Sequence, residues 1–379
     1  MIYFDSAATS LQKPPSVARA LRRAVGSMTS PGRGGHEASI RAAGTAYRCR
    51  EAAAKLFHVE EPDHIVFTHN ATHGLNLAIK SLVEEGDRVL ISAYEHNSVV
   101  RPIQAAGAEL IVAPSAPFAV EETLWAFEEN IRAGGIDLVV CNHVSNVFGF
   151  ILPVERIGAI CREWGLPFVV DASQSAGVLE VNAKTLGAAF IAMPGHKGLY
   201  GPQGTGLLLC GDRPSKTIIE GGTGGDSLSR EAPAYLPDRL EAGTHNMPGI
   251  AGLLEGIRFV KERGRENILQ HERLLLRRLI AGLEEIRGLH LFAASDPACQ
   301  TGVLSFYLDG LDCEMVAEHL SAMDVGVRAG LHCSPMAHES AGTLDTGTVR
   351  VSFSAFNTGR EVEQFLWALS HVVKKMSKK

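Results

Sequence analysis

Residues 167–197 read PFVVDASQSAGVLEVNAKTLGAAFIAMPGHK, and their pattern predicts how the chain folds. Two short apolar runs, 167–171 and 189–193, have the length of buried strands. The first run ends on Asp171, and Lys197 follows the second. In an open α/β sheet, functional groups gather at the carboxyl ends of the parallel strands. We therefore expect Asp171 and the loop before Lys197 to share one edge of a sheet.

The same alternation extends over the first half of the chain. Short apolar runs, with amphipathic segments between most of them, predict strands at 64–68, 88–92, 109–113, 137–142, 167–171, 189–193 and 206–210. Nearly continuous Val, Ile and Leu in such runs is typical of a parallel sheet covered by helices on both faces. The predicted fold class is therefore α/β, with a mostly parallel seven-stranded sheet.

The pattern changes after Pro248. Two long helical segments are followed by shorter strands and a final helix, at 249–263, 265–287, 289–293, 302–307, 348–354 and 359–373. This order predicts a smaller α+β domain beside the large one. We expect residues 15–262 to form the large domain, and residues 1–14 and 263–379 to form the small C-terminal domain, with the N-terminal segment packing at the junction.

Composition narrows the class of protein. The chain has 379 residues, 45% of them hydrophobic and 21% charged, which is typical of a soluble globular protein. Its net charge of -6 and the lack of a basic stripe interleaved with aromatic residues give no support for nucleic-acid binding. Because no apolar run is long enough to span a bilayer and residues 1–6 do not resemble an export signal, we expect a cytoplasmic protein without a membrane partner.

The cysteines do not form a recognisable framework. The odd number of cysteines and the lack of CxxC spacing argue against a disulfide framework and against a metal site. The seven cysteines are Cys49, Cys141, Cys161, Cys210, Cys299, Cys313 and Cys333. Cys141, Cys161 and Cys210 lie in apolar patterns and are expected to be buried and unreactive. Cys333 differs, because it lies in a segment of loop composition.

Lys197 and Asp171 together suggest a chemistry. A lysine in a glycine-rich loop is usually a solvated surface residue, and an aspartate that ends a strand is often a turn or cap residue. In this order within an α/β pattern, however, the two residues fit an enzyme that uses pyridoxal 5'-phosphate (PLP) as its cofactor. Such an enzyme needs a lysine for a Schiff base and an acid facing the ring nitrogen of the cofactor.

Two further segments fit the same cofactor. Residues 68–74 lead from a strand into a helix, whose free N–H groups can bind a phosphate through Ala71 and Thr72. The alternative is that Asn70 or Thr72 only caps that helix. His96 follows the next strand, where its ring could stack on the cofactor, although an isolated histidine is more often structural.

The motifs together resemble a known family. The chain is similar, nearly end to end, to the class V aminotransferases of the fold-type I PLP enzymes, and most of all to the Suf-type cysteine desulfurases, a group that includes selenocysteine lyases. The residues that carry this resemblance are Phe4–Thr9, Arg33–His36, Glu95–His96, Val144–Gly149, Val170–Gln174, Gly195–Lys197 and Val327–Cys333.

The resemblance implies roles around the cofactor. Lys197 would be the covalent attachment point, Asp171 the partner of the pyridinium nitrogen, and Gln174 a donor to the ring hydroxyl, while His96 would stack on the ring. The remaining implied roles are phosphate binding by Thr72 and His196, orientation of substrate and cofactor by Asn146, and a contact of Thr223 with the phosphate in a neighbouring subunit. A homodimer with shared active sites would follow.

It also implies roles toward L-cysteine. Arg350 matches the arginine that holds the substrate carboxylate, a task that suits its planar fork of donors. His36 and Arg328 are further candidates for substrate binding, although Arg328 could equally brace its own loop. Cys333 would attack the substrate sulfur and carry it as a persulfide, leaving L-alanine.

Some positions depart from the family pattern, and alternatives stay open. Pro194 replaces a Ser or Thr that often binds phosphate, and Asn97 and Leu331 replace common histidines. The short interval from Cys333 to Arg350 favours the Suf-type loop, and therefore a protein that accepts the persulfide, for example in iron–sulfur cluster assembly. A selenocysteine lyase, a cysteine sulfinate desulfinase, a class V aminotransferase or epimerase, and a non-enzymatic PLP-binding scaffold are the alternatives.

Overall fold

The structure is a computed structural model that describes residues 1–32, 34–213, 215–225 and 228–376. Its centre is a seven-stranded sheet, which confirms the predicted α/β fold. In spatial order its strands are β2 (Ile65–Thr68), β8 (Gly206–Cys210), β7 (Phe190–Pro194), β6 (Phe168–Asp171), β5 (Leu138–Asn142), β3 (Arg88–Ser92) and β4 (Glu109–Ala113). Only β8 runs antiparallel to its two neighbours, and the other adjacent pairs are parallel.

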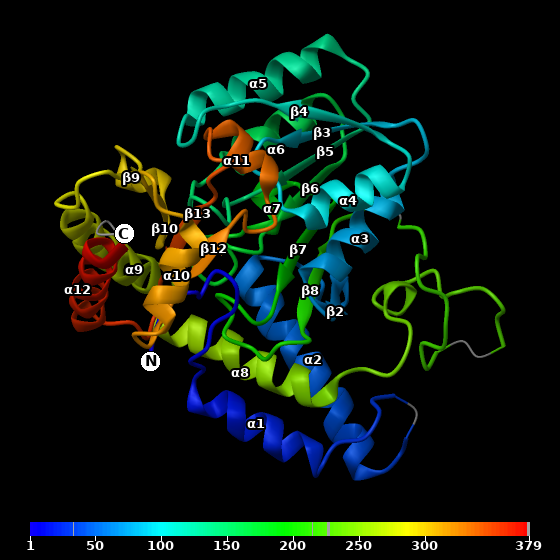
Figure 1. Ribbon diagram of the computed structural model, residues 1–379. Coiled ribbons are helices and arrows are strands. Elements are labelled where there is room, and N and C mark those ends of the chain that lie inside the picture. The colour runs from blue at the N-terminus through cyan, green and yellow to red at the C-terminus, as the bar shows by residue number, and fades with distance from the viewer. Residues whose placement is uncertain (33, 214, 226–227, 377–379) are drawn as a thin grey trace.

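Helices cover both faces of this sheet, as Figure 1 shows. The two faces alternate along each strand, so that Leu138 and Val140 of β5 join one core while Val139 and Cys141 join the other. Helices α3 (Ala71–Leu82) and α4 (Asn97–Ala105) pack on the first face. The second face is covered by α2 (Glu37–Phe57), α5 (Val120–Ala133), α6 (Val154–Glu163) and α8 (Met247–Arg263).

A second, antiparallel sheet follows α8 in the chain. Its strands, in spatial order, are β12 (Arg328–Gly330), β13 (Thr348–Ser352), β10 (Val303–Leu308) and β9 (Leu289–Phe292). The helices whose apolar residues share its core are α9 (Arg265–Leu283), α10 (Cys313–Ser321) and α12 (Gly359–Met376). The N-terminal segment also joins this core, because Phe4 is fully buried there and β1 (Ile2–Tyr3) pairs with β11 (Val325–Gly326).

The remaining helices are short or lie at the edges of these layers: α1 (Pro15–Val25), α7 (Ala183–Leu186) and α11 (Pro335–Ser340). The sequence pattern did not predict helices α10 and α11 or the short strands β1, β11 and β12. Figure 1 shows the described part of the β8–α8 connection reaching away from the β2 and β8 edge of the large sheet. Within the described residues, the helices are too short or too polar to cross a membrane.

Candidate active site

A cavity of about 210 Å³ lies where β5, β6 and β7 of the large sheet end. It brings together most of the residues that the sequence predicted for the cofactor. Its lining includes Ala71, Thr72, His96, Asn146, Asp171, Gln174, His196 and Lys197. Parallel strands deliver these side chains to one edge, which is the reason that residues far apart in the sequence meet here.

Lys197 follows β7 and lines the cavity. Burial, together with the nearby Arg350 and Arg328, lowers the pKa of its ammonium group to about 8 against the attraction of Asp171. About a tenth of this amine is therefore uncharged at pH 7, far more than for an exposed lysine. An uncharged amine is the form that can act as a nucleophile or a base.

Asp171 ends β6 beside both neighbouring strands, opposite Asn142 of β5 and Ala192 of β7. Its side chain is buried, and its Oδ1 accepts a hydrogen bond of 2.9 Å from the backbone N–H of Ser173. Asp171 therefore offers a fixed acceptor to a ligand in the cavity.

The amino terminus of α3 provides donors at another part of the cavity. Asn70 caps the helix, because its side chain accepts a 2.8 Å hydrogen bond from His73 N–H. This cap is compatible with a phosphate site, because it engages the N–H of His73 and not those of Ala71 and Thr72, which line the cavity. The Oγ1 of Thr72 lies 2.8 Å from the Oγ of Ser98. An anion would meet backbone donors and the positive end of the helix dipole here.

Two histidines complete the lining. The Nδ1 of His96 accepts a 3.0 Å hydrogen bond from Ser98 N–H, so the ring proton of the neutral histidine belongs on Nε2. Burial lowers the pKa of His96, and it lowers the pKa of His196 to about 4. The Nδ1 of His196 lies 3.0 Å from Thr9 Oγ1. Both rings are therefore mainly uncharged at pH 7.

Arg350 lies on β13, in the sheet next to the cavity, and its guanidinium is almost completely buried. One of its terminal nitrogens donates to Asp5 Oδ1 and the other to the backbone oxygen of Asn146, each at 2.9 Å. Its Nε is buried without a partner among the described residues. Asp5 also accepts from the Nε of Arg328 at 3.1 Å, and therefore joins the two arginines.

Cys333 lies in the loop between β12 and α11, and it is exposed, unlike the other cysteines. The five cysteines Cys49, Cys141, Cys161, Cys210 and Cys313 are buried, as expected for three of them, and Cys299 is partly buried. Burial raises the pKa of Cys161 to about 12 and makes that thiol unreactive. The Cys333 loop reaches the cavity through Asn146, whose side chain bonds to His332 and Ser334.

Residues 2–365 match the aminotransferase class-V family. The chain belongs to this family. A probable cysteine desulfurase of Pyrococcus abyssi is 34% identical over 99% of this chain and 95% of its own length. A second, from Methanothermobacter thermautotrophicus, is 31% identical and covers 96% of this chain and 92% of the relative. The resemblance noted in the sequence is thus confirmed at the level of the family.

Solved structures agree with these relatives. The apo cysteine desulfurase of Thermococcus onnurineus NA1 superposes with a TM-score of 0.87 at 34% identity, over 99% of this chain and 95% of that one. A cysteine desulfurase of Escherichia coli has a TM-score of 0.86 over 98% and 94% of the two chains. Because its identity is 24%, that similarity supports the shared fold alone.

Not every residue expected in this class V active site lines the cavity. Arg350 and the Cys333 loop reach it through Asn146, and Arg328 is joined to Arg350 through Asp5. His36 and Thr223 belong to other parts of the chain. His36 caps α2, where its Nδ1 accepts from Ser39 N–H at 3.4 Å. Thr223 belongs to the β8–α8 connection, and neither residue lines the cavity. Their roles toward substrate and toward a neighbouring subunit stay predictions. Arg33, the first residue of the motif Arg33–His36, lies outside the described residues.

The sequence pattern assigned no role to several residues that shape the class V site. Asp5 and Thr9 belong to the motif Phe4–Thr9, but nothing in their spacing indicated that Asp5 would meet two arginines 323 and 345 positions away. Ser98 and Ser334 are small polar residues in contexts where a cap or a turn is the ordinary expectation. Only the folded chain shows their partners.

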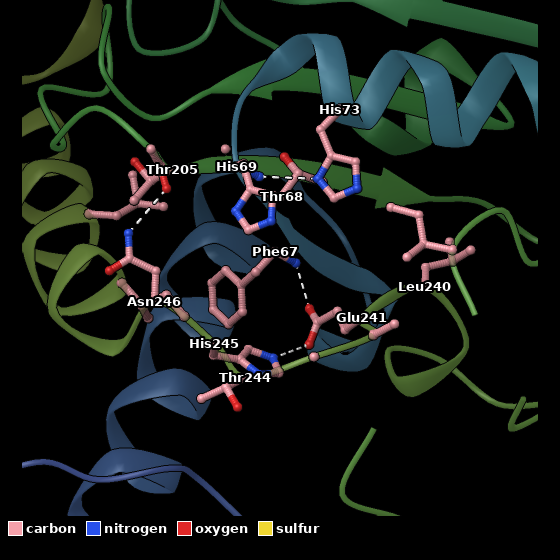
Figure 2. A pocket seen from close by; sticks show the side chains of 17 residues that line it. Phe67, Thr68, His69, His73, Thr205, Leu240, Glu241, Thr244, His245 and Asn246 are labelled. Carbon is pink, nitrogen blue, oxygen red and sulfur yellow. Dashed lines mark hydrogen bonds and ion pairs between the residues drawn. The ribbon is translucent and has the colours of Figure 1, made fainter. Parts of the chain in front are cut away.

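A second cavity, of about 140 Å³, lies on the other side of the β2–α3 turn. Figure 2 shows that the carboxylate of Glu241 inside it already meets Phe67 N–H and the ring of His245. Buried Arg50 also pairs with Glu241. Because these charges are paired with one another, this cavity is a less suitable place for chemistry than the one at Lys197. Within the described part of the chain, no group of three or more His, Cys, Asp or Glu is arranged to hold a metal ion.

Proposed function

We propose that the protein is a PLP-dependent cysteine desulfurase that converts L-cysteine to L-alanine and takes up the sulfur as a persulfide on Cys333. The observation that carries the proposal is the exposed Cys333, on a loop bonded to the cavity residue Asn146. Lys197 and Asp171 line the same cavity, and the buried Arg350 borders it. The names of the relatives support the same activity.

The donors and acceptors of the cavity fit PLP. The N–H groups of Ala71 and Thr72 suit its phosphate, which His196 would help to hold, and Asp171 suits its ring nitrogen. Gln174 Nε2 uses one hydrogen on the backbone oxygen of Ala7 and keeps another for the ring hydroxyl. When bound, PLP supplies an aldehyde that condenses with amines and a ring that withdraws electrons.

His96 and Lys197 have separate tasks in this proposal. The neutral ring of His96 is suited to stack on a flat ligand, since its lowered pKa removes a charge that would need solvent. Lys197 would hold the cofactor covalently and, once released as an uncharged amine, would accept the proton from Cα of the substrate. The lowered pKa of Lys197 makes that base available near neutral pH.

Arg350 and Asn146 would orient the substrate. The guanidinium of Arg350 is buried, and its Nε has no partner among the described residues, so a carboxylate would satisfy it. Arg328 is half exposed and paired with Asp5, which suits a supporting role. His36 lies outside the lining of this one chain. Its contribution would require a rearrangement or a neighbouring subunit.

The sulfur transfer to Cys333 balances without an outside oxidant. The Cys333 thiolate bonds to the substrate sulfur while the bond from that sulfur to Cβ breaks, and the electron pair stays on the carbon skeleton. Two protons then complete L-alanine, one at Cβ and one at Cα. The products are one alanine and one Cys333 persulfide, from which a thiol reductant or an acceptor protein would remove the sulfur.

We also infer a homodimer with shared active sites and an acceptor protein for the persulfide. Thr223 lies away from the cavity of its own chain, which is compatible with a contact to the phosphate in a neighbouring subunit. The exposure of Cys333 lets an acceptor reach the sulfur. Delivery of sulfur to iron–sulfur cluster assembly would be one use of such a transfer.

Anaerobic turnover of L-cysteine by the PLP-loaded protein, with a thiol reductant present, tests the activity. Equal amounts of alanine and sulfide are expected, and both should be lost in Cys333→Ser while the bound cofactor keeps its absorbance. Alanine from L-selenocysteine alone would assign a lyase, and alanine with sulfite from cysteine sulfinate alone a desulfinase. Amino transfer that survives Cys333→Ser would contradict the proposal and favour an aminotransferase.

A further inference from the structure

The loop that carries Cys333 is fixed by hydrogen bonds at three consecutive residues. The Nδ2 of Asn146 donates to the backbone oxygen of His332 at 2.8 Å, and the backbone N–H of Asn97 donates to the oxygen of Cys333 at 2.9 Å. The hydroxyl of Ser334 donates to Oδ1 of Asn146 at 2.7 Å. One asparagine side chain therefore bonds the loop on both sides of the cysteine.

The backbone of this loop has an unfavourable conformation. His332 and Cys333 are consecutive non-glycine residues in the left-handed region, with φ of 51° and 59°. Such conformations persist only where the surrounding structure holds them in place. The ring of His332 also lies 3.1 Å from Thr348 Oγ1, and the Ser334 N–H donates to the oxygen of Leu331 within the loop. Of the three hydrogen bonds that join the loop to residues 97 and 146, two depend on Asn146.

We propose that Asn146 and Ser334 are positioning residues that hold the Cys333 thiol in place for sulfur transfer. This inference rests on the proposed desulfurase activity. Both side chains are buried, and the hydroxyl of Ser334 donates to the amide oxygen of Asn146. This hydrogen bond is therefore not a chance contact on the surface. The Ser334 hydroxyl also fixes which end of the Asn146 amide faces His332.

The same asparagine links the thiol to the group proposed to bind the substrate carboxylate. A terminal nitrogen of Arg350 donates to the backbone oxygen of Asn146 at 2.9 Å. One residue thus connects Arg350 through its main chain to the Cys333 loop through its side chain. This arrangement sets the separation between the carboxylate-binding arginine and the thiol, which an attack on the substrate sulfur requires.

The Ser334→Ala variant tests this role, because it removes one hydrogen bond and leaves Asn146 Oδ1 buried without its donor. We expect the backbone amide of Asn97, which bonds to Cys333, to exchange with deuterium about tenfold faster. We expect kcat for alanine formation to fall about tenfold, with KM for L-cysteine and PLP content unchanged. Ser334→Thr keeps a hydroxyl and should restore most of both. Ser321→Ala, at an exposed position on α10, is the matched control.

Each departure from this pattern overturns the proposal. Normal exchange together with normal kcat in Ser334→Ala would mean that the hydroxyl positions nothing. Faster exchange with normal kcat would mean that the loop is held but that its position does not matter for transfer. A lower kcat with normal exchange would assign Ser334 to another step. Because hydrogen exchange needs no turnover, this readout remains valid even if the protein does not release sulfide.

Discussion

The buried amine of Lys197 gives the site a characteristic pH dependence. Its lowered pKa of about 8 means that it becomes uncharged far below the pH at which an exposed lysine does. We expect the rate at which the apoprotein takes up PLP, followed by visible absorbance, to rise with pH and to level off above about 8. A rate that rises without a plateau toward pH 10 would show that Lys197 is not desolvated.

The forked guanidinium of Arg350 makes a conservative replacement costly. It bonds Asp5 and the Asn146 oxygen at the same time, and a lysine offers only a compact ammonium. In steady-state assays, Arg350→Lys should raise KM for L-cysteine by about tenfold or more, the equivalent of one charge-assisted hydrogen bond. The exposed Arg287→Lys serves as the control. An unchanged KM in Arg350→Lys would place the carboxylate elsewhere.

Helix α9 carries a carboxyl group that should make its packing depend on pH. Glu272 is buried, and burial raises its pKa to about 8, above the 4.5 expected in the unfolded chain. Between these values the unfolded state loses a proton that the folded state keeps, so folding stability decreases as pH rises from 4.5 to about 8. This sign is the opposite of that for a carboxylate in an ion pair.

Replacement of Glu272 by Gln should remove that dependence. In urea denaturation, the free energy of unfolding of Glu272→Gln relative to wild type should grow from pH 5 to pH 8, by an amount on the order of a few kcal/mol. Glu285→Gln, an exposed position just beyond α9, is the control. A difference that stays constant with pH would mean that Glu272 is ionised in the folded protein.

At the scale of the whole molecule, we propose that the chain divides into a large domain of residues 15–262 and a small domain of residues 1–14 and 263–379. One apolar core draws on Phe4 and on residues from 275 onward, while the cores on the two faces of the large sheet use earlier residues almost alone. Phe4 packs edge-on against Phe353, with ring centroids 4.9 Å apart. The N-terminal segment thus belongs to the core of the small domain.

Truncation of Phe4 tests that division. Phe4→Ala should destabilise the protein by roughly 3 to 5 kcal/mol, as for other large aromatic residues in cores. The loss should appear as faster hydrogen exchange in β10 and α12, with β5 and α3 unaffected. Equal loss of protection in both regions would indicate a single cooperative unit and contradict the proposed boundary.

Much of this fold could be predicted from the sequence, because the strands of the large sheet can be recognised as short apolar runs. Each of the seven strands of the large sheet overlaps its predicted range, since buried parallel strands read as uninterrupted apolar runs. Helices α10 and α11 were not predicted, because elements of nine and six residues leave little periodicity. The short pairings of β1 with β11 and of β12 with β13 depend on contacts between distant segments.

The candidate site also has a part that could be predicted from the sequence and a part that could not. Lys197, Asp171 and the start of α3 follow strand ends, and strand ends can be recognised in a sequence. The links of Asp5 to Arg350 and of Asn146 to Ser334 join residues 345 and 188 positions apart, and no local pattern predicts such pairs. The hydrogen bonds that hold the Cys333 loop likewise join it to residues 97 and 146, which no local pattern indicates.

Mass spectrometry of the peptide that contains Cys333 tests the central claim most directly. The PLP-loaded protein would be mixed with L-cysteine anaerobically, without reductant, and digested after alkylation. The account predicts that Cys333 alone gains the mass of one sulfur atom, in step with one equivalent of alanine, and that reductant removes it. Alanine formation without added sulfur on Cys333, or added sulfur on Cys299 instead, would contradict the account.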